Sequence, residues 1–368
     1  MSHFNVASTI DRWNLEDDCG NKNRYITINR TENYLSELRW KLGLNTNPCT
    51  QLRKGRRCVY CGFRNYKNPI PPTDVGVLFS QILKEKDLTD IRRLELYVSG
   101  SFFDDNEVSP QARIEIMREL NRTSVKEVIL ESRPEFITAK NLESLGRVMN
   151  PRRITIAIGV ETLNDKLRES LAKGFSTADV ITSIHTIGKA NMNFQAYLLL
   201  NPPTINNDRK AIRDIIDSAC QILHFTRHKV TNVILAVQPF FLAKNSVVAL
   251  DPAFSQYVRP PWLYTTAITL KMLSIMTSQI KRNFHIVLGN ENDNVDALLT
   301  SSNYTTSGEA CSCTDTVKRM LFDVNSSQEK FDQGVREVLN SSCRCKDLWQ
   351  KEIGITKTEL IDIMAERE

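Results

Sequence analysis

Residues 154–162 read ITIAIGVET, an apolar run rich in β-branched residues that ends in a glycine and a glutamate. Short apolar runs bounded by polar residues, Gly or Pro are typical of buried strands in parallel sheets. A first strand is expected around residues 38–44, before the others. Five further runs share the features of 154–162: 94–98 (LELYV), 126–131 (KEVILE), 194–200 (FQAYLLL), 232–237 (NVILAV) and 284–288 (FHIVL).

Segments with helical periodicity separate these strands, at residues 110–120, 138–149, 177–190, 208–224 and 261–280. Alternation of strand and helix implies crossover connections and a parallel sheet that helices cover on its outer side. The pattern therefore predicts an α/β fold, a partial (β/α)6 TIM-like barrel. In such a barrel the loops at the carboxyl ends of the strands hold the chemistry.

The chain divides into three expected parts: a lead-in at 1–36, the barrel at 37–289, and a small cysteine-rich C-terminal appendage at 290–368. Hydrophobic residues make up 41% and charged residues 25% of the 368 residues, the balance of a globular protein. Apolar runs fall short of the roughly 20 residues of a membrane span. The first residues lack the features of a secretory signal, so we expect a cytoplasmic protein with reduced cysteines.

Three cysteines, Cys49, Cys58 and Cys61, lie in the segment 47–63, NPCTQLRKGRRCVYCGF, directly after the first expected strand. Structural zinc sites normally take four protein ligands, whereas three thiolates leave one position open. An iron–sulfur cluster with three cysteine ligands keeps one iron free for a cofactor or substrate. The spacing favours a [4Fe-4S] cluster, and a zinc knuckle completed by a distant residue is the alternative.

Four basic residues, Arg53, Lys54, Arg56 and Arg57, separate the first two of these cysteines. Such a cluster is either a solvated loop or an anion-binding loop. The net charge of +5 permits a nucleic-acid substrate but does not require one.

Small and polar residues follow several of the expected strands: Gly100 and Ser101, Glu131 and Arg133, Gly159 and Glu161, and Gln238. The first pair offers backbone groups to a ligand or forms an ordinary strand-to-helix turn. At 131 and 133, a carboxylate suits ribose hydroxyls and a guanidinium suits a bound carboxylate. The same two side chains also suit a structural ion pair.

Five phrases give the sequence a family resemblance: GSFFDD (100–105), ESRPEFIT (131–138), IGVETLNDKLRESLAKGF (158–175), AYLLLNPP (196–203) and RPPWL (259–263). In this order they are similar to the RaSEA family, the radical S-adenosylmethionine (SAM) partner in archaeosine formation. The likeness spans about residues 45 to 350. The GVET and KGF segments also resemble the catalytic subunit of Elongator.

The resemblance implies a radical SAM barrel in which SAM is cleaved to a 5'-deoxyadenosyl radical that removes hydrogen from the substrate. It implies that Tyr60 lies against the adenine and that the strand-end residues named above line the SAM site. In the RaSEA family the substrate is tRNA carrying a lysine adduct of 7-cyano-7-deazaguanine, and C–N cleavage yields archaeosine. A partner protein would supply RNA contacts, and a ferredoxin or flavodoxin would supply electrons.

A second cysteine set forms two C-x-C pairs, Cys311 with Cys313 and Cys343 with Cys345. Four thiolates suit a tetrahedral zinc site or an auxiliary iron–sulfur cluster. Zinc is favoured, since the Elongator subunit that the chain resembles has a structural zinc near a cysteine-rich stretch. Two other functions stay open: a radical SAM enzyme for a small metabolite or natural-product intermediate, and a non-catalytic zinc-dependent protein that binds RNA or a partner.

Overall fold

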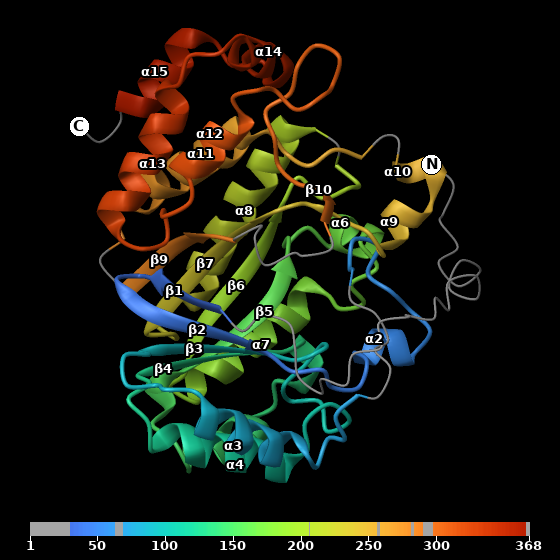
Figure 1. Ribbon diagram of the computed structural model, residues 1–368, viewed down its shortest axis with the longest axis vertical. Helices are drawn as coiled ribbons and strands as arrows, with labels where there is room; N and C mark the ends of the chain where they lie inside the picture. The colour runs from blue at the N-terminus through green and yellow to red at the C-terminus, as the bar shows by residue number, and fades with distance from the viewer. Residues whose placement is uncertain are drawn as a thin grey trace.

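The computed structural model describes residues 30–62, 69–205, 207–255, 258–280, 283–289 and 297–365. Within these residues the main sheet has eight strands, in the spatial order β1-β2-β3-β4-β5-β6-β7-β9 (Figure 1). All neighbouring strands from β2 to β9 are parallel, and β1 pairs antiparallel with β2. Their bounds are β1 (Arg30–Tyr34), β2 (Glu37–Gly43), β3 (Arg93–Tyr97), β4 (Glu127–Glu131), β5 (Ile154–Glu161), β6 (Asn193–Leu200), β7 (Asn232–Pro239) and β9 (Asn283–Leu288).

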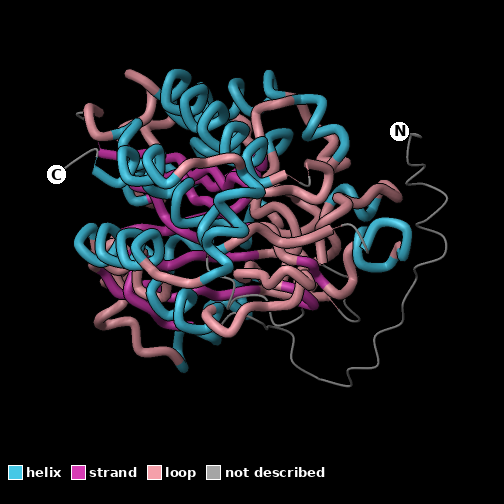
Figure 2. The backbone as a smooth tube through the Cα atoms, turned by 90° about the horizontal axis from the view of Figure 1, so that it is seen from above, coloured by secondary structure: helices cyan, strands magenta, loops and turns pink. Residues whose placement is uncertain are grey.

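Helices cover the convex side of this sheet (Figure 2). Side-chain caps fix where several begin: Ser109 accepts from the N–H of Ala112 at the start of α4, and Ser176 forms a capping box with Asp179 at the start of α7. The helices of the barrel and mouth are α2 (Thr50–Arg53), α3 (Val75–Glu85), α4 (Pro110–Asn121), α5 (Ala139–Gly146), α6 (Asp165–Ser170), α7 (Thr177–Lys189), α8 (Asp208–Thr226), α9 (Val247–Leu250), α10 (Pro252–Ser255) and α11 (Leu263–Thr277). Among the described helices, none has both the length and the apolar character needed to cross a bilayer.

The sheet is curled into a half-barrel. The hydroxyl of Tyr197 on β6 donates to Glu95 on β3 at 2.6 Å, although two strands lie between them in the sheet. Two side chains so far apart in strand order can meet only across a concave face. The predicted α/β partial barrel is therefore confirmed, with its predicted strands, and the structure adds β1 as an antiparallel edge.

Alternation along each strand separates the two faces. On β2, Trp40 and Leu42 face the helices and join the main core, while Arg39 and Lys41 point into the barrel. Arg39 lies 2.8 Å from the buried Glu95. Burial alone would raise the pKa of Glu95, but Arg39 and Lys41 outweigh it and lower that pKa. The inner face at β2 and β3 is thus polar, and its charges are paired.

Four helices follow the barrel and pack on α11: α12 (Thr314–Met320), α13 (Gln328–Asn340), α14 (Arg344–Ile353) and α15 (Lys357–Ala365) (Figure 1). Trp349 of α14 is fully buried, and its indole N–H donates to Thr265 at 2.9 Å. A short two-stranded ladder pairs β8 (Leu242–Ala243) with β10 (Ala297–Leu299). Residues 1–29 of the expected lead-in lie outside the described residues, and the division at residue 290 stays a prediction.

Candidate active site

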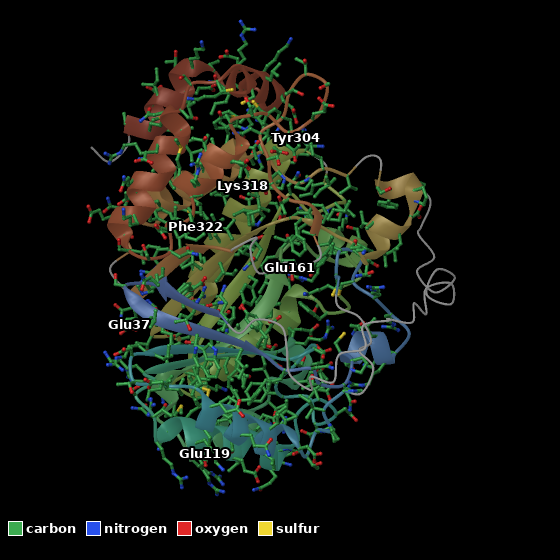
Figure 3. All side chains as sticks on the ribbon, in the orientation of Figure 1. Glu37, Glu119, Glu161, Tyr304, Lys318 and Phe322 are labelled. Carbon is green, nitrogen blue, oxygen red and sulfur yellow. The ribbon has the colours of Figure 1, made fainter. Side chains whose placement is uncertain are left out.

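The three-cysteine loop lies at the carboxyl ends of β2 and β3, the end of the sheet opposite Glu37 (Figure 3). Cys49 is the residue before α2, and it packs directly on Gly100 of the neighbouring loop. A Cβ at position 100 would lie 2.2 Å from the Cβ of Cys49 and 2.9 Å from its Cα. Only glycine allows the two loops to approach so closely.

Cys58 and Cys61 form a tight turn, in which the N–H of Cys61 donates to the carbonyl of Cys58 at 3.1 Å. The intervening Val59 anchors it: its N–H donates to Leu171 and its carbonyl accepts from Val248, each at 3.1 Å. Burial raises the pKa of the Cys58 thiol, and nearby Lys173 and Arg133 oppose that rise.

Lys173 connects Tyr60 to Glu161. Its Nζ lies 2.7 Å from Glu161 Oε1 and donates to the Tyr60 hydroxyl at 3.0 Å. Burial alone would lower the pKa of Lys173, but Glu161 outweighs it, so that pKa is raised. The ammonium group is therefore held charged beside the aromatic residue of the C-x2-C turn.

Gly159 and the backbone at Glu161 make room for this pair. A Cβ at 159 would meet Glu161 Oε1 and Lys173 Nζ, each at 2.8 Å. Glu161 has a φ of +62°, and the register of β5 against β6 shifts between 159 and 161. Non-glycine residues in this region are rare and strained, and such strain clusters at functional sites. Figure 3 shows Glu161 at the end of β5, toward the centre of the molecule.

Glu131 and Arg133 lie beside this group but do not pair with each other. Arg133 Nε bonds Glu135 at 2.7 Å, and its Nη2 donates to the carbonyl of Lys173 at 2.9 Å. Glu131 is half-buried, and burial raises its pKa to about 7. No hydrogen bond to its carboxyl group is found among the described residues, so this acid faces the barrel mouth without a donor.

Ser101 is fully buried and is bonded both within its own loop and to the loop after β4. Its N–H donates to Glu107 at 3.1 Å, and its hydroxyl accepts from the N–H of Arg133 at 3.1 Å. Burial raises the pKa of Glu107 to about 8. Within the described part of the chain its Oε1 accepts no hydrogen bond, and Arg53 Nη1 lies 4.0 Å away. Ser101 therefore shapes the loop that Cys49 packs against.

Gln238 lies apart from this group, on β7, two strands away from β5. Its amide covers Gly289, where a Cβ would meet Gln238 Oε1 at 1.8 Å. The structure thus gathers Tyr60, Gly159, Glu161, Glu131 and Arg133 around Lys173. It leaves Gln238 on the far side of the mouth.

The donor set at the mouth fits a cluster better than a single ion. In the described part of the chain, the group of thiol, imidazole and carboxyl atoms close enough for one ion is the C-terminal set, and it includes none of Cys49, Cys58 and Cys61. A cuboidal cluster is wider than one ion and holds its thiolates further apart. Cys49 is still close enough to Cys58 to influence its pKa.

The four C-terminal thiols all lie within 4.8 Å of one another. Cys311 and Cys343 are 3.6 Å apart, and Cys313 and Cys345 are 3.3 Å apart. Tetrahedral zinc bound at about 2.3 Å from each sulfur spaces its thiolates by about 3.8 Å. This group, between α12 and α14, has the size of a site for one metal ion.

Sequence reasoning missed Lys173 and Glu107 as parts of the site. Lys173 lies in the KGF turn, a segment that supports the family resemblance but has no pattern that predicts a chemical role for the lysine. Glu107 follows its strand by ten residues, and no local pattern indicates that it folds back under Gly100. The sequence did indicate a polar inner face, because Arg39 and Lys41 alternate with apolar residues on a strand that was expected to be buried.

A curled half-barrel of parallel strands, with a three-cysteine loop at its mouth, is the arrangement of the radical SAM superfamily. The chain is 24% identical to archaeosine synthase subunit beta of Methanosarcina acetivorans, over 82% of this chain and 81% of the relative. It is 26% identical to the protein of that name in Thermococcus kodakarensis, over 62% and 69%. An uncharacterised protein of Methanocaldococcus jannaschii is 27% identical over 88% and 84%. The chain is thus related in sequence to archaeosine synthase subunit beta, and this relationship supports a radical SAM enzyme.

No family model matches the chain. Among solved structures, SuiB of Streptococcus suis bound to S-adenosylmethionine matches with a TM-score of 0.49 and 13% identity, over 70% of this chain and 51% of that one. The Elp3 protein of Methanocaldococcus infernus matches with a TM-score of 0.42 and 13% identity, over 63% and 56%. The chain spans little more than half the length of these two proteins.

Proposed function

We propose that this protein binds a [4Fe-4S] cluster through Cys49, Cys58 and Cys61 and cleaves SAM to act on a modified tRNA. The substrate would be a lysine-modified 7-deazaguanine in tRNA, and the reaction a C–N cleavage of the archaeosine type. The observation that carries the proposal is the convergence of the three-cysteine loop with Gly100 at the mouth of the half-barrel. The similarity to archaeosine synthase subunit beta supports the choice of substrate.

When bound, the cluster and SAM would supply a 5'-deoxyadenosyl radical, the chemistry that a polypeptide does not provide by itself. The chain's own residues would bind the cluster and SAM and orient them. Lys173 and Arg133 place two cations beside Cys58 and offset the negative charge of bound thiolates. Tyr60 is fixed by Lys173 at 3.0 Å and would lie against the adenine.

Glu131 is the acid best suited to a ligand hydroxyl. Its raised pKa, about 7, keeps a share of the carboxyl groups protonated near neutral pH, so the group can donate as well as accept a hydrogen bond. Gly100, Ser101, Gly159, Glu161 and Gln238 complete the proposed lining of the SAM site. Gly159 in particular leaves the space that the pair of Lys173 and Glu161 needs.

The name of the relatives also supports a partner protein, because each is a subunit of a synthase. We propose a partner that supplies RNA contacts, and a ferredoxin or flavodoxin as the electron donor. Cysteines that bind a cluster must stay reduced. This need for a reducing compartment supports the cytoplasm as the location. At the C-terminal site, the thiol spacing supports one zinc ion over an auxiliary cluster.

Anaerobic reconstitution with iron and sulfide, followed by reduction in the presence of SAM, tests the cluster assignment. We expect 5'-deoxyadenosine from the wild-type protein and none from Cys58→Ala. The matched control is Cys220→Ala, since Cys220 is an exposed cysteine on α8, away from the mouth. Loss of product in both variants, or in neither, would contradict the assignment.

The substrate is tested by supplying tRNA that carries the lysine adduct and following archaeosine by mass spectrometry. Release of archaeosine only with the adduct supports the proposed lyase. Turnover of SAM that responds to a small metabolite and not to tRNA would favour the small-molecule alternative. Protein that contains zinc at both cysteine sets and never iron would favour a non-catalytic binding protein.

A further inference from the structure

The basic loop between Cys49 and Cys58 is built rigidly at the end of α2. Gly55 has a φ of +68°, its N–H donates to Leu52 at 3.0 Å, and the N–H of Arg56 donates to Gln51 at 2.8 Å. These two bonds and the left-handed glycine form a Schellman motif, a fixed end of a helix. Backbone hydrogen bonds therefore fix the turn of this loop.

The four cations of this loop divide into two kinds. Arg53 pairs with Asp104, and Arg57 donates to the carbonyl of Asn245 and to that of Cys61. Lys54 and Arg56, which flank the glycine, are exposed and have no acidic partner among the described residues. Two arginines thus anchor the loop, and the other two cations point to solvent.

The anchor on Asn245 brings a third cation to the same rim. Lys244 is its neighbour in sequence, exposed and likewise without an acidic partner in the described part of the chain. A second contact joins the two segments, since a Cβ at Gly62 would lie 2.6 Å from the Cβ of Ala243. Figure 1 shows α2 and α9, which flank these segments, on the same right-hand side of the molecule.

We propose that Lys54, Arg56 and Lys244 form a phosphate-binding rim that holds the backbone of a substrate RNA beside the barrel mouth. The inference depends on the proposed function, because it names how a tRNA would be held at that site. Unpaired, pre-positioned cations beside a mouth fit a phosphodiester chain, whose charge is read without regard to sequence. The anchoring arginines keep the rim in register with the cysteine loop.

A matched pair of triple variants tests the rim. One is Lys54→Ala/Arg56→Ala/Lys244→Ala. The control is Lys84→Ala/Arg118→Ala/Lys189→Ala, which also removes three positive charges. These three cations lie in the last turns of α3, α4 and α7. Helices that return antiparallel to the strands end at the opposite side of the barrel from the mouth.

Binding of a tRNA transcript is measured by filter retention at several salt concentrations, together with SAM cleavage in the absence of RNA. We expect the rim variant to bind at least about tenfold more weakly and to lose about 2 to 3 from the slope of log affinity against log salt. The control variant should keep the wild-type slope, and all three proteins should cleave SAM equally without RNA.

Three results would overturn the rim. If both variants bind as the wild type does, the rim is wrong and the tRNA substrate stands. If the wild type itself does not bind tRNA, the rim is wrong, while the substrate is decided separately by archaeosine formation from tRNA that carries the lysine adduct. If the rim variant alone loses RNA-independent SAM cleavage, these residues belong to the cofactor site and not to an RNA surface.

Discussion

Replacing Gly100 by alanine should displace the cysteine loop. The added Cβ would lie 2.2 Å from the Cβ of Cys49, and carbon atoms in contact are normally about 3.5 Å or more apart, so the loops must separate by about 1.3 Å. Overpacking of this kind costs about 1 to 3 kcal/mol. A shift of about 1 Å in a reacting group can lower a rate on the order of 100-fold.

Two measurements follow the displacement: iron bound after anaerobic reconstitution, and the rate of 5'-deoxyadenosine formation. We expect both to fall in Gly100→Ala, the rate by about 100-fold. The control is Gly146→Ala at the end of α5, where the new Cβ meets the Cγ of Pro151 at 3.3 Å. Equal iron content and equal rates in the two variants would refute the close contact of the two loops.

Lys173→Met removes the cation that pairs with the buried Glu161, and we expect a loss on the order of 3 kcal/mol in the free energy of unfolding, measured in urea, with Lys173→Arg retaining most of it. Burial raises the pKa of Glu107 from 4.5 to about 8, so the folded protein keeps a proton that the unfolded chain has lost. Its contribution to stability is complete below pH 4.5 and is lost as the pH rises to about 8. The melting temperature of Glu107→Gln should therefore fall less than that of the wild type across this range, and parallel curves would argue against a buried acid. Cys345→Ser should abolish metal binding at the C-terminal site and expose α14 to proteolysis while RNA-independent SAM cleavage persists; unchanged zinc content by mass spectrometry would count against this ligand.

The strands of the barrel and several of its helices were predictable because each strand is a short apolar run and helices such as α8 have clear periodicity, whereas α3 was not among the predicted segments. The run at 154–162 became β5, with its glycine and glutamate at the mouth. The five stretches that give the family resemblance include strand ends at the same mouth. Local pattern was sufficient for strands such as β5 and β7 because burial on both faces selects apolar residues along most of the strand, whereas β2 and β3 have charged residues on the inner face.

The partners of the site residues were not predictable in the same way. Arg133 bonds Glu135 and the carbonyl of Lys173, and not Glu131, because the 3-10 turn at Pro134–Phe136 places Glu135 beside the guanidinium. Lys173 reaches Glu161 only because Gly159 leaves space and the backbone at 161 is left-handed. Such contacts depend on tertiary geometry that spacing along the chain does not encode.

The central claim is that the cluster held by Cys49, Cys58 and Cys61 keeps one iron open to SAM. The most direct measurement is electron paramagnetic resonance of the reduced, reconstituted protein, recorded with and without SAM. We predict a [4Fe-4S] signal whose g values change when SAM is added, and its loss when any of the three cysteines is replaced by alanine. A signal that SAM leaves unchanged, or zinc in place of iron at these cysteines, would contradict the account.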